Sequence, residues 1–129
     1  MLDTNIVSDL VKNPAGMIAQ RIREVGEAGL CVSIIVAAEL RFGCLALGSP
    51  AFTRKVEGVL SRLTVAPFES PADLAYAKMR LALRRRGLPI GPNDLLIAAH
   101  AVSLNVPLVT RNVAEFRRVS GLSIENWLE

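Results

Sequence analysis

GPNDLLIAAHAVSLNVPLVT, residues 91–110, carries the clearest fold signal in the chain. Residues 94–104 are apolar almost all round a helix, which is the pattern of a helix buried in a protein core. VPLVT, residues 106–110, follows almost at once and has the apolar, β-branched composition of a buried strand. A core helix joined directly to a buried strand is the unit from which helix-covered parallel sheets are built.

Predicted strands and helices alternate along the rest of the chain as well. Short apolar runs predict strands from Leu2 and at 30–33, 63–68, 106–110 and 122–124, the last at an edge. Helices are predicted between them at 6–12, 15–28, 34–47, 51–62, 70–86 and 94–105, with Ser33, Ser70 and Asn93 as N-caps. We therefore expect one α/β domain, residues 1–129, with three α/β/α layers around a central, mainly parallel sheet.

The amino-acid composition argues against a membrane or secreted protein. Apolar residues make up 51% of the chain, yet no apolar run reaches the roughly 18–20 residues that span a bilayer, and no secretory signal is visible. We expect a cytoplasmic protein, not a membrane protein, in which Cys31 and Cys44 are buried thiols in a reducing environment. The apolar excess predicts a surface that is covered by a partner or by a second copy in a homodimer. It includes Ile34, Ile35, Leu45 and Leu47 on or near one predicted helix.

Four acidic residues stand alone in apolar surroundings: Asp3, Glu39, Asp94 and Glu115. Burying an isolated carboxylate is costly, so acids in such positions are usually paired or bind a metal. Asp3 and Asp94 could also be helix caps, and Glu115 a solvated surface residue, whereas Glu39 interrupts an apolar run on or near the buried face of its helix. However, each follows a predicted strand or lies at the start of a helix, so all four can converge beyond the carboxyl ends of a parallel sheet.

Carboxylates that meet in this way need a counter-cation, because like charges a few ångströms apart repel. No His or Cys lies near these acids in the sequence, and a site of oxygen ligands alone favours Mg²⁺, with Mn²⁺ as a substitute. Such a metal activates water for phosphodiester hydrolysis. A receiver or phosphatase domain, the rival magnesium fold, would need a second early acid and a Lys after VPLVT, and the chain has neither.

The ordered motifs LDTN, SIIVAAEL, GPNDLLIAAHA, LVTRNVAEF and GLSIENW resemble those of PIN-domain ribonucleases, and more closely the VapC toxins of bacterial type II toxin–antitoxin pairs. The resemblance spans nearly the whole chain and implies a PIN-like fold. It implies that Asp3, Glu39 and Asp94 are catalytic metal ligands, with Glu115 as the fourth catalytic acid. Thr4, Asn5, Thr110 and Asn112 would give polar support, although many PIN domains have Asp in place of Asn112.

The function implied by the resemblance is a metal-dependent endoribonuclease toxin. It would hydrolyse RNA, in the most similar subgroup initiator tRNA, and would block translation until neutralised by a cognate antitoxin. The implied assembly is a homodimer within a toxin–antitoxin hetero-oligomer. The alternative from another class is a catalytically silent nucleic-acid-binding or co-repressor subunit, whose acids are only helix caps.

Arginine supplies most of the positive charge, and four arginines lie near the end of one predicted helix: Arg80, Arg84, Arg85 and Arg86. Beside an acidic metal site, such a cluster would bind an RNA backbone. The alternative is a solvated last turn that complements the helix dipole. We expect His100 to be a packed core histidine rather than a general base, and Trp127 to pack on the core or on a partner.

Overall fold

A parallel sheet forms the centre of the structure, a computed structural model that describes residues 1–128. Glu129, the last residue of the expected domain, lies outside the described residues. Strand β1 (Cys31–Ser33) pairs in parallel with β2 (Thr64–Ala66), and β3 (Leu108–Val109) pairs in parallel with β4 (Ile124–Glu125). The expected parallel pairing is therefore confirmed, and the strands are shorter than the apolar runs that predicted them.

Residues 1–3 join these two pairs into one sheet. The Leu2 amide donates to the Cys31 carbonyl at 2.9 Å, and the Val109 amide donates to the Met1 carbonyl at 2.8 Å. Leu2 forms a parallel bridge with Val109 and is fully buried. The spatial order is thus β2, β1, residues 1–3, β3 and β4, with the start of the chain in the middle.

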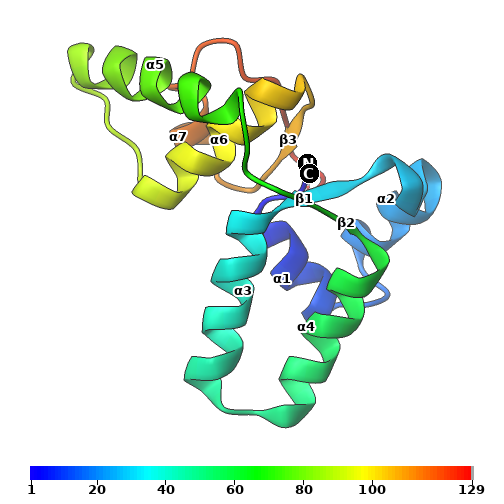
Figure 1. Cartoon of the computed structure of the whole chain (residues 1–129). Helices are drawn as coiled ribbons and strands as arrows, with labels where there is room; N and C mark the ends of the chain where they lie inside the picture. The colour runs from blue at the N-terminus through cyan, green and yellow to red at the C-terminus, as the bar shows by residue number, and fades with distance from the viewer. Residues whose placement is uncertain (129) are drawn as a thin grey trace.

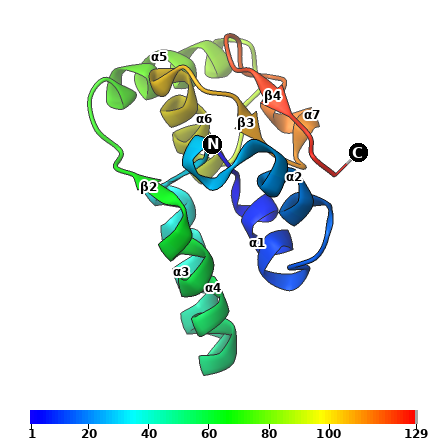
Figure 2. The same ribbon diagram turned by 90° about the vertical axis from the view of Figure 1, so that its right-hand side faces the viewer.

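Helices cover both sides of this sheet, as the α/β/α prediction requires. Helices α1 to α4 lie on one side of the strands, and α5, α6 and α7 lie on the other (Figures 1 and 2). Their bounds are α1 Thr4–Lys12, α2 Met17–Val25, α3 Ile34–Leu47, α4 Pro50–Arg62, α5 Ala72–Arg85, α6 Pro92–Leu104 and α7 Val113–Phe116, with a short 3₁₀ turn at Glu27–Gly29.

Helix α6 is buried, as its apolar sequence predicted. Residues 97–101 are all buried, and α5 packs along α6. His100 is 1% exposed, which confirms the expected core histidine. Its Nδ1 lies 2.8 Å from the Ser33 Oγ, so this ring links α6 to the junction of β1 and α3. Trp127 packs against the core, as expected, with the Arg21 guanidinium 5.6 Å from its ring centroid.

Two of the three predicted N-caps are wrong. Helix α6 begins one residue before Asn93, at Pro92, and its cap is Gly91, because proline is well suited to the first helical position. Pro71 occupies the cap of α5, and the Ser70 side chain makes no capping bond. Several helix bounds also differ from prediction by one to three residues. Helix α1 starts at Thr4, where Asp3 caps it, and α2 runs from Met17 to Val25 rather than over 15–28. The bounds of α4, α5 and α6 differ by one or two residues.

Helices α3 and α4 form a hairpin that projects from the body of the molecule (Figures 1 and 2). Gly48 allows the sharp reversal because its φ of 68° is left-handed. The outer part of α3 is apolar and open to solvent, with Phe42 70%, Leu45 84% and Leu47 63% exposed. Of the other residues expected to be uncovered, Ile34 is exposed and Ile35 is half-buried.

Both cysteines are free, with Cys44 buried and Cys31 half-buried. Within residues 1–128, no helix combines the length and the apolar character needed to cross a membrane.

Ser33 and Ser49 cap α3 and α4 in the same way, but only Ser33 has a second buried partner. Ser33 Oγ accepts from the Ile35 amide at 3.1 Å, and Ser49 Oγ accepts from the Phe52 amide at 3.2 Å. Ser49→Ala should therefore cost about 1 kcal/mol of unfolding free energy, the usual value of a cap. Ser33→Ala should cost roughly 2–3 kcal/mol, because it also removes the buried hydroxyl that lies 2.8 Å from His100 Nδ1. Urea unfolding of the two variants measures the difference, and equal losses would contradict the second role of Ser33.

Candidate functional site

Asp3 is the most buried acid of the site, and three neighbours hold it. Its side chain accepts from the Thr4 amide at 2.8 Å, from the Thr110 hydroxyl at 2.7 Å and from the Asn5 amide group at 3.3 Å. Burial raises the pKa of this carboxyl, while the bonds from Thr110 and from the Thr4 backbone oppose the rise. The carboxylate therefore has a fixed orientation at the end of its strand.

Glu39 reaches the same place from the second turn of α3. The Thr4 hydroxyl donates to its Oε1 at 2.7 Å. Thr4 is the first residue of α1 and directly follows Asp3, so one residue connects the first acid to the second. Thr4, Asn5 and Thr110, the residues expected to give polar support, thus each donate a hydrogen bond to Asp3 or Glu39.

Asp94 and Glu115 face each other across Gly91. The Gly91 amide donates to Glu115 Oε1 at 2.8 Å, and the Asn112 side-chain amide donates to the other carboxylate oxygen. A Cβ added to Gly91 would lie 3.5 Å from Asp94 Oδ2 and 3.7 Å from Glu115 Oε1. The backbone bond from Gly91 is the main reason that the pKa of Glu115 is lowered.

The four acids share one electrostatic environment. Burial, followed by repulsion from Asp3 and Glu115, raises the pKa of Asp94 to about 7. Asp3, Glu39 and Asp94 line one cavity of about 630 Å³, and Asn112 lies on its wall. Within residues 1–128, none of the four acids takes part in an ion pair. The site is therefore a cluster of negative charge whose groups repel one another.

The chemistry of this donor set fits a hard divalent cation, because every candidate ligand is an oxygen and a cation would relieve the repulsion. Among residues 1–128, no three acidic, His or Cys side chains already stand close enough together to hold an ion. The acids surround a common cavity instead. Their assignment as metal ligands stays a prediction.

Sequence reasoning missed several residues of the cavity wall. Lys12, Asp9 and Arg111 line it, and Arg111 lies 3.9 Å from Asp9 while its backbone amide donates to Asn5. Helical spacing could have found Asp9, because it follows Asn5 by four residues on α1 and so lies on the same face. The two cations place positive charge at the wall of an otherwise acidic cavity.

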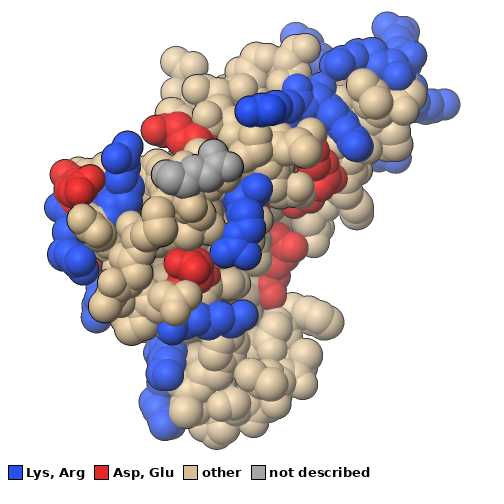
Figure 3. Space-filling view, turned by 180° about the vertical axis from the view of Figure 1, so that it is seen from behind, with Lys and Arg blue, Asp and Glu red and all other residues tan. Residues whose placement is uncertain are grey.

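The predicted arginine cluster lies at the end of α5, on the same side as the acids. Figure 3 shows Lys and Arg side chains gathered over that end, and acidic side chains in the hollow between it and the α3–α4 hairpin. The Arg86 guanidinium donates to the Arg118 carbonyl at 2.8 Å, and Arg80 donates to the Tyr76 hydroxyl at 3.0 Å. Arg84 and Arg85 are exposed.

The raised pKa of Asp94 predicts how the metal-free protein responds to pH. Between pH 4 and about 7 the folded state holds a proton that the unfolded state has lost, so stability should fall as pH rises through this window. In EDTA, Asp94→Asn should flatten this fall and raise the melting temperature at pH 8 above that of the parent. Asp73→Asn, which removes an exposed acid from the first turn of α5, is the matched control. The same pH response in Asp94→Asn as in the parent would contradict the repulsion described above.

Comparison with known proteins places this geometry in a family. The PIN domain family model matches residues 1–122. The chain is 37% identical to the tRNA(fMet)-specific endonuclease VapC of Salmonella typhimurium over 98% of this chain and 96% of that protein. It is 40% identical to the ribonuclease VapC1 of Haemophilus influenzae strain R2866, with the same coverage.

Solved structures agree with the sequence comparison. The fold matches a chain of the VapBC2 complex of Rickettsia felis, which was solved bound to a DNA fragment from its promoter. The TM-score is 0.90 at 35% identity, and the match covers 98% of this chain and 97% of the matched chain. The fold also matches the DNA-bound VapBC complex of Salmonella typhimurium with a TM-score of 0.89, 38% identity, and coverage of 98% and 96%. The acid cavity at the carboxyl ends of the parallel strands, the family match over residues 1–122 and these full-length relatives show that the chain belongs to the VapC group of the PIN-domain family.

Proposed function

We propose that this protein is the ribonuclease toxin of a VapBC toxin–antitoxin pair, a divalent-metal-dependent endoribonuclease that hydrolyses RNA phosphodiester bonds. The observation that carries the proposal is the convergence of Asp3, Glu39 and Asp94 on one cavity without an ion pair. Two relatives over nearly the full length are named as a ribonuclease and an endonuclease. A single catalytic domain of residues 1–129 would carry the whole activity.

Asp3, Glu39 and Asp94 would hold Mg²⁺, or Mn²⁺ in its place. When bound, the metal supplies an activated water and positive charge at the scissile phosphate. The chain itself fixes the ligands. Thr110 and the Thr4 amide orient Asp3, and the Thr4 hydroxyl orients Glu39. Glu115, held by Gly91 and Asn112, keeps a further negative charge beside Asp94.

The RNA substrate is proposed to be a tRNA, specifically the initiator tRNA. A relative with 37% identity is named as specific for tRNA(fMet). The exposed arginines at the end of α5 would hold the RNA backbone beside the acid cavity, because guanidinium groups bind phosphate oxygens in pairs. Cleavage of this substrate would block translation.

The partner is proposed to be a cognate antitoxin, within an assembly that also contains a second copy of this chain, in the cytoplasm. Two solved relatives are VapBC complexes. Phe42, Leu45 and Leu47 leave three strongly exposed apolar side chains on α3, and clustered exposed apolar side chains often mark a protein–protein contact. A partner helix or a second copy would cover this surface.

A second role is favoured by the DNA in both of those complexes. Together with its antitoxin, the chain would act as a co-repressor subunit on its own promoter. Such a role does not require the acid cavity, so it would survive substitutions that stop RNA cleavage.

The Asp94→Asn variant distinguishes an enzymatic function of this protein from a function in binding alone. The amide keeps the size of the side chain but removes one charge, so metal affinity and cleavage should fall by at least the roughly 10–100-fold that the loss of a metal-site partner costs. Cleavage of initiator tRNA with Mg²⁺ and thermal stabilisation by Mn²⁺ should both be lost, while binding to the tRNA in EDTA persists. Asp73→Asn is the control, and Asp3→Asn should behave like Asp94→Asn. Cleavage by Asp94→Asn at the rate of the parent would show that the proposed mechanism is wrong.

A double variant at Arg84 and Arg85 tests the proposed RNA-binding surface. Their joint replacement by Ala should weaken tRNA binding and reduce its salt dependence by about 0.7–0.9 log units per lost phosphate contact. Arg86 is left in place because its guanidinium is bonded to the Arg118 carbonyl. A matched double variant on α4, Arg54→Ala with Lys55→Ala, removes the same charge from exposed positions of the hairpin. Equal losses in the two variants would mean that net charge, rather than this surface, binds RNA.

A further inference from the structure

We propose that a cavity between α5 and residues 87–95 binds one unstacked nucleobase of the RNA, from a nucleotide next to the cleaved bond. This inference rests on the proposed function and adds to it a base-binding site. The cavity has a volume of about 540 Å³. Its walls are largely apolar, formed by Leu83, Pro89, Ile90, Pro92 and Leu95.

One aromatic ring gives the cavity a stacking surface. Tyr76 lines it and is half-buried, with the Arg80 guanidinium carbon 5.9 Å from the ring centroid. Arg80 also donates to the tyrosine hydroxyl at 3.0 Å, so the ring and the guanidinium form one ordered unit. Aromatic rings and arginine planes are the surfaces on which proteins stack splayed-out RNA bases.

The positive charge beside the cavity also suits a nucleotide, which carries a phosphate. Arg80 and Arg84 line the cavity one helical turn apart, on the same face of α5. A base inserted between the apolar walls would bring its own phosphate close to these two guanidinium groups. An apolar pocket with cations at its side fits a nucleotide better than it fits an uncharged apolar ligand or a purely ionic one.

The cavity is next to the acid site. Pro92 and Leu95, on its wall, flank Asp94 in the chain, and Gly91 bonds Glu115. The first turn of α6 therefore faces both the apolar cavity and the acids. A nucleotide held in the cavity would place the adjoining phosphodiester beside the carboxylates.

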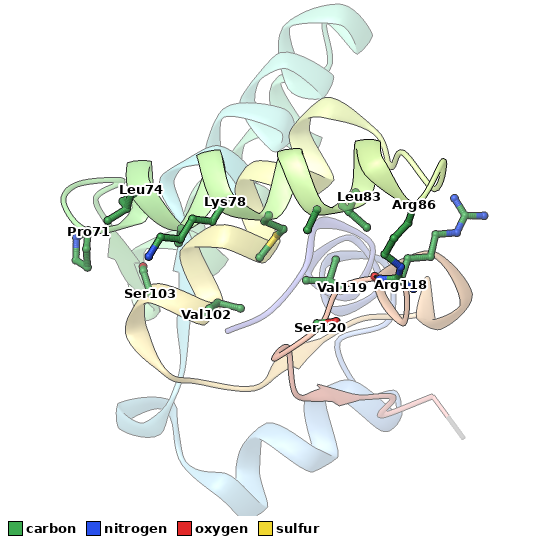
Figure 4. Close-up of a pocket in the computed structure, with 13 residues that line it drawn as sticks. Pro71, Leu74, Lys78, Leu83, Arg86, Val102, Ser103, Arg118, Val119 and Ser120 are labelled. Atoms are coloured by element: carbon green, nitrogen blue, oxygen red, sulfur yellow. The ribbon is translucent and has the colours of Figure 1, made fainter.

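A groove on the opposite flank of α5 does not have these features. It is lined by Leu74, Lys78 and Val102 among others, and by Arg86 and Arg118 at one end (Figure 4). Both arginines are already bonded to backbone carbonyls, Arg86 to Arg118 and Arg118 to Pro89. Within residues 1–128, its wall contains no aromatic ring. Lys78 therefore gives a matched control on the same helix.

The experiment measures RNA binding in EDTA and cleavage with Mg²⁺ for Tyr76→Ala, Tyr76→Phe and Lys78→Ala, with initiator tRNA as the probe. Loss of one stacked base should weaken binding by Tyr76→Ala roughly 5- to 100-fold. Tyr76→Phe keeps the ring and loses only the hydroxyl that accepts from Arg80, so it should bind more tightly than Tyr76→Ala. Lys78→Ala, which lies outside the cavity, should stay close to the parent. Because stacking carries no charge, Tyr76→Ala should keep the salt dependence of the parent.

A second arm separates stacking from a merely structural role. An RNA stem–loop derived from that tRNA is made with an abasic nucleotide on each side of the cleaved bond in turn. For one of these two RNAs, the affinity of the parent protein should fall to that of Tyr76→Ala for the intact RNA. The Tyr76→Ala variant should bind that abasic RNA and the intact RNA equally well, because neither pair can form the stacking contact. Additive losses, or unchanged binding by Tyr76→Ala, would overturn the base pocket while leaving the nuclease intact. Absence of cleavage by the parent, with Tyr76-dependent binding retained, would instead overturn the proposed function and keep the pocket.

Discussion

The burial of Asp3 is the constraint on which the rest of the site depends. A carboxyl that is only 3% exposed, with other acids nearby, is costly unless hydrogen bonds compensate it. The compensating groups come from both ends of the chain: the Thr4 amide and Asn5 from the start of α1, and Thr110 from the end of β3. Meeting this requirement also fixes Thr4, whose hydroxyl then holds Glu39. One buried carboxyl group thus links residues 1–3, the end of β3 and, through Thr4, helix α3.

The architecture was largely predictable because it depends on periodicity. The largely apolar α6 and the buried run before Thr110 indicated a core helix and a parallel strand, and both are present. The convergence of the acids could also be anticipated, because strand ends in a parallel sheet meet at one edge. The helix caps were harder to predict, because Pro92 and Asn93 are both typical of a helix start; Pro92 takes the first helical position, which leaves Gly91 as the cap.

What could not be predicted depends on contacts between segments that no short pattern links. The bond from the Gly91 amide to Glu115 depends on how residues 87–92 pack, which periodicity does not encode. The distribution of charge has the same origin. On the proposed function, cations at the end of α5 would attract a phosphate backbone, whereas the acid cavity would repel it until a metal neutralised the carboxylates. On the proposed function, binding and cleavage therefore depend on separate sets of residues.

The central position of residues 1–3 in the sheet also has a consequence for synthesis of the protein. Thr110 bonds to Asp3 across a separation of 107 residues, and the Met1 carbonyl has its partner at Val109. Closing so long a loop requires that the intervening chain already exists, so neither pairing can form before residues 109 and 110 have been made. While a ribosome is still adding the first hundred residues, Asp3 lacks its Thr110 partner. The acid cavity is completed only after Thr110 has left the ribosome.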